Sequence, residues 1–374
     1  MTAPLHTRLC DQLGIEVPIL LAGMGVWGMA TPPALVAAVS EAGGLGVLGC
    51  SGLAPEEIRR RIRAVRERTS KPFGVDLLLP ATLAPAATTR SGVRAELRKK
   101  HPAHVAFYES LLKRFDLEPA PVQDDIVISS DLIEAQIAVT LEEKVPVFAA
   151  GLGDPKRVTD RARAQGMITL GLAGSARNAE RQKAAGVDAI VAQGTEAGGH
   201  TGRIANFPLI PQVVDAVAPL PVIAAGGISD GRGVAAALAL GADGVWIGSL
   251  FLTADECDMP DACKDELVAA RSTDMDVTRA WTGKTLRARR NPISDAWAES
   301  GLDPLPTPHQ RVLMEDFLEA AKAAKRWDLF MNAAGQGIGL VARRRPAAEI
   351  MADLVSGASA ALDSLDARLG RRRG

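Results

Sequence analysis

Short, almost wholly apolar runs alternate along the chain with longer stretches in which apolar residues recur at helical spacing. Runs of this kind are typical of strands buried on both faces, and the helical stretches are typical of the crossovers of a parallel sheet. The first two helices are expected at 32–43, with Thr31 as N-cap, and at 54–69. The pattern predicts eight strands, over residues 18–24, 45–49, 73–79, 146–153, 167–173, 188–194, 221–227 and 244–252.

Eight strand–helix units favour a closed (β/α)8 barrel, whose usual size is about 250 residues. An open doubly wound sheet is the structural alternative, and it usually carries its glycine-rich turn after the first strand. Here the richest glycine turns follow the sixth, seventh and eighth strands. We therefore expect an α/β protein with a (β/α)8 TIM-barrel fold.

The alternation breaks at residues 80 to about 125, which are rich in proline, alanine and charge and carry two helical patterns. This segment is expected to be a helical insertion that covers the barrel mouth. Beyond about residue 260 the sequence indicates glycine-rich and basic loops rather than a second fold. The expected organisation is a barrel over 1–350, with 80–125 as its lid, and a C-terminal helix and basic tail over 351–374.

Composition narrows the classes of function. The formal net charge of −1 over 374 residues argues against a general nucleic-acid binder. No apolar run reaches the ~18 residues of a membrane span. The four cysteines lack metal-ligand spacing, so neither a metal site nor a disulfide framework is expected. The N-terminal segment has no apolar core of a signal peptide, so a cytoplasmic protein acting on small molecules is predicted.

Glycines gather where the last two predicted strands end. Gly226 and Gly227 follow the seventh strand, and Gly248 and Ser249 follow the eighth. Turns of this composition expose backbone N–H groups and let an anion approach without a Cβ in its way. Ordinary turn chemistry is the alternative, because glycine is common in such loops. Two glycine turns on consecutive late strands favour a phosphate site, since barrels commonly bind phosphate there.

The sequence "GTEAGGHTG" at 194–202 follows the sixth predicted strand. Its glycines, Gly198 and Gly199, permit a planar ring to approach the backbone. The amide of Gln193 can donate to and accept from a heterocycle. His200 titrates near neutrality and is suited to move a proton at the carboxyl end of the barrel. The alternative is that His200 only bonds a carbonyl within its loop.

Six motifs, in order, resemble the nitronate monooxygenase (2-nitropropane dioxygenase) family of FMN-dependent TIM-barrel enzymes. The resemblance runs from about residue 5 to 345, apart from the insertion. It is more specific for fold and cofactor than for substrate, because flavin enoyl-ACP reductases and NAD(P)H:quinone reductases are similar. The motifs are "PILLAGMGVWG", "EAGGLGVLG", "FGVDLLLP", "DAIVAQGTEAGGHTG", "PVIAAGGISDG…ALALGADGVWIGSLFL" and "AAGQGIGLV".

The resemblance implies that FMN is the cofactor and that His200 is the catalytic base. It places asparagine where this chain has Asp76. A carboxylate there would disfavour a reduced, anionic flavin unless it were protonated or paired. The residues that the resemblance implies for FMN binding are Ala22, Gly23, Met24, Asp76, Gln193, Gly198, Gly199, Gly226, Gly227, Gly248, Ser249 and Gln336.

Three functions follow as hypotheses. The first is oxidation of an alkyl nitronate with O2. The second is NAD(P)H-dependent reduction of an enoyl thioester (CoA or ACP) or a quinone, favoured by the insertion and by the arginines between Arg279 and Arg290, which could attract an anionic substrate. The third is a non-catalytic barrel that binds a phosphorylated ligand. A homodimer is an open expectation, and the physiological substrate is not specified by the sequence.

Overall fold

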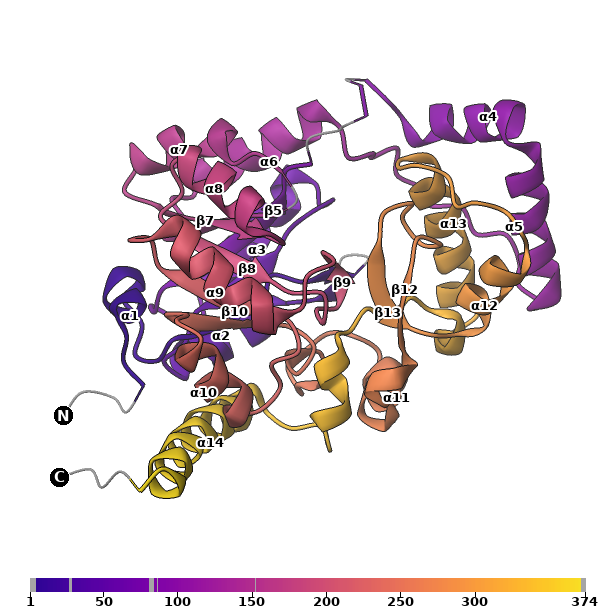
Figure 1. The fold of residues 1–374 in the computed structure, drawn as a ribbon. Coiled ribbons are helices and arrows are strands. Elements are labelled where there is room, and N and C mark those ends of the chain that lie inside the picture. Colours follow the sequence, from indigo (N-terminus) through magenta and orange to yellow (C-terminus); the bar gives the residue numbers. More distant parts are fainter. Residues whose placement is uncertain (1–4, 27–28, 81–83, 86, 152, 371–374) are drawn as a thin grey trace.

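Eight parallel strands form the central sheet of the molecule (Figure 1). The computed structural model describes residues 5–26, 29–80, 84–85, 87–151 and 153–370. A parallel bridge between Leu20 and Leu45 joins the two ends of the sheet, so it closes into a barrel. The predicted (β/α)8 fold is confirmed. Neighbour by neighbour, the strands are β1 (Ile19–Leu21), β11 (Gly244–Ile247), β10 (Val222–Ala225), β8 (Ala189–Gln193), β7 (Ile168–Ala173), β6 (Val147–Gly151), β5 (Phe73–Leu78) and β4 (Gly46–Gly49).

The strands are apolar throughout because both of their faces are covered. Every residue of β1, β4, β6, β10 and β11 is buried. Alternate side chains enter the barrel, where Leu20, Val147 and Ile223 belong to one cluster. Their neighbours face outward, as Ile19 and Leu21 do in the cluster shared with the helices. The continuous apolar runs of the sequence therefore report a doubly covered sheet.

The barrel helices follow the strands, and α14 completes the ring far along the chain. It packs against α10 and α2, which places it beside β11 as the eighth helix. The expected boundary at residue 350 falls inside α14. The helices are α2 (Pro33–Glu41), α3 (Pro55–Arg66), α6 (Ser130–Glu142), α7 (Lys156–Arg163), α8 (Ala176–Ala184), α9 (Asn206–Val217), α10 (Gly231–Ala239) and α14 (Ala347–Arg368), with α1 (Arg8–Leu13) ahead of β1.

One local prediction near β1 needs correction. Pro32, not Thr31, is the N-cap of α2. The Thr31 hydroxyl instead donates to Met24 O at 2.7 Å and accepts from Gly49 N at 2.8 Å, so it ties the loop after β1 to the end of β4. Residues 23–28 match G-x-G-x-x-G by letter. Within the described residues of this motif, Gly25–Val26 form strand β2, which pairs with β3 (Met29–Ala30).

A second group of elements, called the lobe here, lies beside the barrel (Figure 1). It comprises the insertion and the segment between β11 and α14. The expectation of plain loops beyond residue 260 was wrong, because β12 and β13 form an antiparallel sheet with β9 there. The lobe elements are α4 (Arg90–Lys100), α5 (Pro102–Arg114), α11 (Asp261–Ala269), β12 (Met275–Thr278), β13 (Leu286–Arg289), α12 (Pro292–Glu299) and α13 (His309–Ala323), with β9 (Gly199–His200) reaching in from the barrel.

The insertion is held on the lobe by ion pairs to α13. Helices α4 and α5 both pack against α13. Arg90 forms a buried ion pair with Glu315, and the Nε of Arg94 donates to Asp316 at 2.8 Å. No described residue of the insertion lines the cavity considered below; α13 does, through Arg311. The insertion therefore supports the lobe from behind, and its expected role as a lid stays a prediction.

Replacing Arg90 by Met is expected to lower the free energy of unfolding by about 3 kcal/mol, because it leaves the buried Glu315 carboxylate under-compensated. Urea titration followed by circular dichroism measures the change. Lys100→Met is the control on the same helix, because it removes an exposed pair with Glu96 and should cost under about 0.5 kcal/mol. Equal losses in the two variants would contradict the anchoring role of Arg90.

Candidate active site

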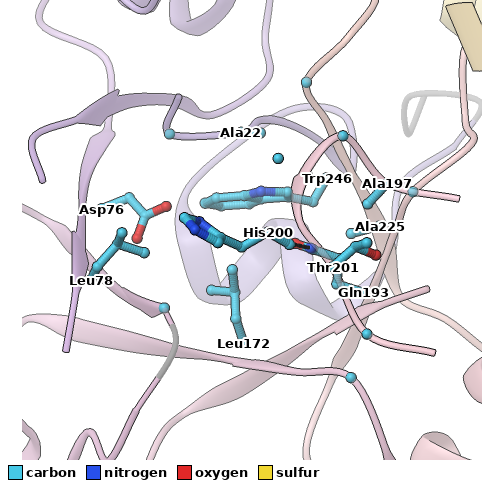
Figure 2. Close-up of a pocket in the computed structure, with 18 of the residues that line it drawn as sticks. Ala22, Asp76, Leu78, Leu172, Gln193, Ala197, His200, Thr201, Ala225 and Trp246 are labelled. Carbon is cyan, nitrogen blue, oxygen red and sulfur yellow. Dashed lines mark hydrogen bonds between the residues drawn. The ribbon is translucent and has the colours of Figure 1, made fainter. Parts of the chain in front are cut away.

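A cavity of about 1090 Å³ lies at the carboxyl ends of the barrel strands, between the barrel and the lobe. Its floor is the top layer of the barrel interior, where Ala22, Leu172, Ala225 and Trp246 meet (Figure 2). Its outer wall comes from the lobe. The volume slightly exceeds the ~300–1,000 Å³ usual for ligand sites. The cavity therefore has room for a cofactor and a substrate together.

The turns after β10 and β11 present backbone donors to this cavity. Gly226 and Gly227 have φ values of 102° and 71°, which favour glycine. A Cβ at Gly227 would lie 3.1 Å from the Cβ of Glu196. Within the described part of the chain, the N–H groups of Gly227, Gly248 and Ser249 donate to no other residue. Gly227 is exposed and Gly248 and Ser249 are half-buried, so these free N–H groups are accessible from the cavity and suited to hold an anion.

The start of α10 adds to this anion site. Asp230 is the N-cap and accepts from Gly233 N at 3.1 Å, so the helix begins directly at the turn. The Ser249 hydroxyl accepts from Gly335 N at 2.7 Å, which leaves its own proton available to a ligand. The positive end of the α10 dipole and these donors act on the same place.

His200 lies on β9, and its imidazole points into the cavity (Figure 2). Strand β9 pairs with Leu286 and Arg287 of β13, so the lobe sheet fixes the backbone on one side. The Gln193 amide donates to His200 O at 2.6 Å from the other side. The ring Nε2 lies 3.1 Å from the Thr282 hydroxyl. The barrel and the lobe thus position this side chain jointly.

The surroundings of His200 keep it neutral. Burial, then the nearby positive charges of Arg311 and Lys284, lower the pKa of the imidazole to about 4. Lys284 itself is partly buried, and desolvation together with Arg311 lowers the pKa of its ammonium group. The Nε of Arg311 donates to Glu315 at 2.7 Å. This wall therefore combines an unprotonated imidazole with positive charge, which suits an anionic ligand.

Asp76 lies in the same cavity (Figure 2), on β5, and is 6% exposed. Its Oδ1 is buried and has no hydrogen-bond partner. Burial alone raises the pKa of the carboxyl to about 8. The loop after β1 presses against it, since a Cβ at Gly23 would lie 2.3 Å from the Cβ of Asp76. A buried carboxyl with an unused oxygen needs either a proton or a ligand.

Nearly all of the residues expected from the sequence come together around this cavity. The exception is Gln336, which does not line it. Its backbone N donates to Glu196 O at 2.9 Å and its carbonyl accepts from Ser272, so it braces the loop behind Gly198. Its predicted contact with the cofactor stays a prediction. The residues that do line the cavity are Ala22, Gly23, Met24, Asp76, Gln193, Gly198, Gly199, His200, Gly226, Gly227, Gly248 and Ser249.

The arginines between Arg279 and Arg290 do not form a substrate site. None of them lines the cavity. Arg287 is buried and donates to the carbonyls of Thr195 and Met275. Arg289 pairs with Glu266 at 3.3 Å and Arg290 pairs with Asp295 at 2.5 Å. The expectation that this cluster attracts an anionic substrate is corrected: these side chains hold the lobe together.

The sequence did not predict that Thr282, Lys284 and Arg311 line the cavity beside His200. Thr282 and Lys284 lie in a turn between β12 and β13 that carries no apolar periodicity, and Arg311 lies on a helix that was not expected. Only the pairing of β13 with β9 brings this turn to His200. That contact joins segments more than 80 residues apart, and no local pattern reports it.

Two further features are absent among the residues that the structure describes. No group of three or more His, Cys, Asp or Glu side chains is arranged to hold a metal ion. No helix among them is long and apolar enough to cross a membrane.

A closed parallel barrel with its deep cavity at the carboxyl ends of the strands is the arrangement of barrel enzymes. The chain belongs to the nitronate monooxygenase family: the sequence model of that family matches residues 6–357. A Mycobacterium tuberculosis protein with a monooxygenase name is 38% identical over 94% of this chain and 96% of its own length. A Staphylococcus aureus (strain Newman) protein named probable nitronate monooxygenase is 32% identical over 93% of this chain and 96% of its own.

Solved structures agree with the family assignment. Nitroalkane oxidase from Streptomyces ansochromogenes superposes with a TM-score of 0.80 at 32% identity, over 96% of this chain and 99% of that one. FabK from Thermotoga maritima superposes with a TM-score of 0.76 at 31% identity, over 97% and 99%. The family consists of flavin-dependent oxidoreductases, so this chain is an oxidoreductase and the non-catalytic alternative is set aside.

The cavity of the cofactor-free protein is expected to keep His200 neutral down to about pH 4. Histidine-labelled protein followed by NMR between pH 4 and 8 measures this, with His200→Gln used to assign the signal. Lys284→Met should raise the pKa of His200 toward its ordinary value, because it removes one of the two nearby positive charges. Protonation of His200 between pH 6 and 7 in the unmodified chain would show that the imidazole is not desolvated.

Proposed function

We propose that this protein is an FMN-dependent monooxygenase that oxidises alkyl nitronates with O2, with His200 as base. The observation that carries the proposal is the pairing of two features in one cavity. One is the set of unpartnered N–H groups at the turns after β10 and β11, and the other is a neutral imidazole beside a cationic wall.

FMN fits the first feature. Its phosphate would be held by the N–H groups of Gly227, Gly248 and Ser249 and by the start of α10. A cradle made of glycine turns suits a phosphate, because glycine adopts the positive φ values of Gly226 and Gly227 and leaves the backbone N–H groups open to an anion. Bound FMN supplies the redox chemistry, taking electrons from the substrate and passing them to O2. The FMN assignment rests on these donors together with the family.

The substrate fits the second feature. A nitronate is an anion, and Lys284, which has no acidic partner among the described residues, provides positive charge in the cavity. The Thr282 hydroxyl has Lys284 O within 3.4 Å as an acceptor. When it donates there, His200 Nε2–H donates to Thr282, and Nδ1 is left to accept a proton. His200 would then remove the α-proton of a neutral nitroalkane, and Lys284 would stabilise the resulting anion.

The reductase hypothesis remains the second candidate, because FabK covers 97% of this chain at a TM-score of 0.76. The arginine cluster no longer supports it. Lys156 and Arg181, at the outer part of the cavity, are the side chains that could meet the phosphates of a larger substrate. The two hypotheses differ in which compound delivers electrons to the flavin.

Anaerobic mixing of the yellow holoenzyme with candidate reductants tests the proposal directly. An alkyl nitronate is expected to bleach the flavin absorbance within seconds, and readmitted O2 should restore it. NADH and NADPH should bleach it at least a hundredfold more slowly. Rapid bleaching by NAD(P)H and none by nitronate would establish the reductase instead.

His200→Ala is expected to separate the two forms of the substrate. Turnover of a neutral nitroalkane should fall by roughly 10²–10⁴-fold, because general base catalysis is lost. Turnover of the preformed nitronate should fall by less than about tenfold, since no proton has to be removed. Steady-state O2 consumption measures both, and Lys99→Met on the distant helix α4 is the control. Equal losses on the two substrates would contradict the base role.

A further inference from the structure

Asp76 is the one acidic side chain buried in the cavity, among the residues that the structure describes and that line it. The Oδ1 atom has no hydrogen-bond partner. Backbone surrounds the carboxyl, from Gly23 on one side and Gly151 on the other, where a Cβ would lie 3.7 Å from Oδ1. The protein therefore packs closely around this carboxyl but gives its Oδ1 no hydrogen bond, so that atom is available to a ligand in the cavity.

No neighbouring charge compensates an ionised Asp76. The Cys50 thiol is one titratable neighbour, and the backbone N of Cys50 donates to Asp76 O at 3.0 Å. Burial raises the pKa of that thiol to about 12, so it is neutral. Burial is the only influence on the pKa of Asp76 itself. The other titratable or charged side chains of the cavity are His200 on β9, Lys284 and Arg311 in the lobe, Asp154 and Lys156 near the start of α7, and Arg181 on α8.

An unpaired carboxylate in such a place is costly, and the cost is avoided when the group is protonated. A protonated carboxyl has one O–H that can donate a hydrogen bond, much as the NH2 group of an asparagine amide can. A flavin ring offers acceptor nitrogens and oxygens along its edge. The buried position with an unused oxygen therefore suits a donor to that ring better than a fixed negative charge beside it.

We propose that Asp76 binds the cofactor in its protonated form and donates a hydrogen bond to the isoalloxazine ring, so that FMN binding is coupled to one proton. This inference rests on the proposed use of FMN and concerns one side chain within that site. Protonation of Asp76 then determines the affinity for FMN. In Asp76→Asn the amide is a permanent donor, so the variant mimics the protonated, binding form.

The coupling has a definite sign. The carboxyl of the empty protein titrates at about pH 8. Above that pH a proton must be taken up before FMN binds, so the affinity falls by up to tenfold per pH unit. Below it the proton is already present and the affinity does not depend on this group. The Asn variant has no such proton and should keep its affinity throughout.

The experiment measures the dissociation constant of FMN for the deflavinated protein between pH 7 and 9.5, by quenching of FMN fluorescence. The ratio of the constants of the unmodified chain and Asp76→Asn is the quantity of interest, because ionisations of FMN itself affect both proteins equally. The ratio is expected to be near one at pH 7 and to rise to about tenfold at pH 9. A ratio that stays constant or falls with pH would overturn the proposal.

Gly227→Leu is the matched control. It places a side chain in the phosphate cradle and should weaken FMN binding by the same factor at every pH, so its pH dependence should parallel that of the unmodified chain. Failure of the two proposals is distinguishable. Absence of FMN uptake at any pH by the unmodified chain and by Asp76→Asn would remove the proposed function and this inference with it. Uptake with a constant ratio would remove only the role of the Asp76 proton.

Discussion

Exclusion of water from the barrel mouth is the constraint on which the site depends. Desolvation shifts three titratable groups there toward their neutral forms: it lowers the pKa of His200 and Lys284 and raises that of Asp76. The barrel alone would leave this end open to solvent. The lobe covers it, and the same burial that creates a site for a flat ring also sets the protonation of its side chains.

One connection through which the lobe achieves this is strand β9. Strand β9 leaves the barrel after β8 and pairs with β13, so the loop that bears His200 is shared between the two parts. Gly198 permits this path, because a Cβ there would lie 2.4 Å from the carbonyl carbon of Ala334. The helices of the insertion pack on α13 and steady Arg311 from behind. The position of His200 thus depends on contacts far from the cavity.

The sequence predicts what is local and periodic. All eight barrel strands follow from apolar runs, and the glycines after these runs mark the turns. Closing the barrel brings those turns together. The lobe sheet could not be found this way, because β13 reads Leu-Arg-Ala-Arg. Arg287 is nevertheless buried and donates to a backbone carbonyl, and the partly exposed Arg289 pairs with Glu266. Lys284 enters the site only through that sheet. Thr31 is a second example, because its hydroxyl bonds the distant backbone of Met24 and Gly49 and does not cap the helix that follows it.

The protonation states of His200 and Asp76 together determine the charge of the inner cavity. With His200 neutral and Asp76 protonated, no described side chain of the inner cavity is negative, and Arg311 and Lys284 supply its positive charge. Under the proposed function, such a cavity would favour a phosphate at the late turns, an anionic substrate beside Lys284, and negative charge on the reduced flavin ring. Ionising Asp76 would oppose the last of these most strongly, because it lies in a desolvated place with no compensating cation. A protonated carboxyl is therefore the state in which this chain can carry an aspartate where its relatives are expected to carry an amide.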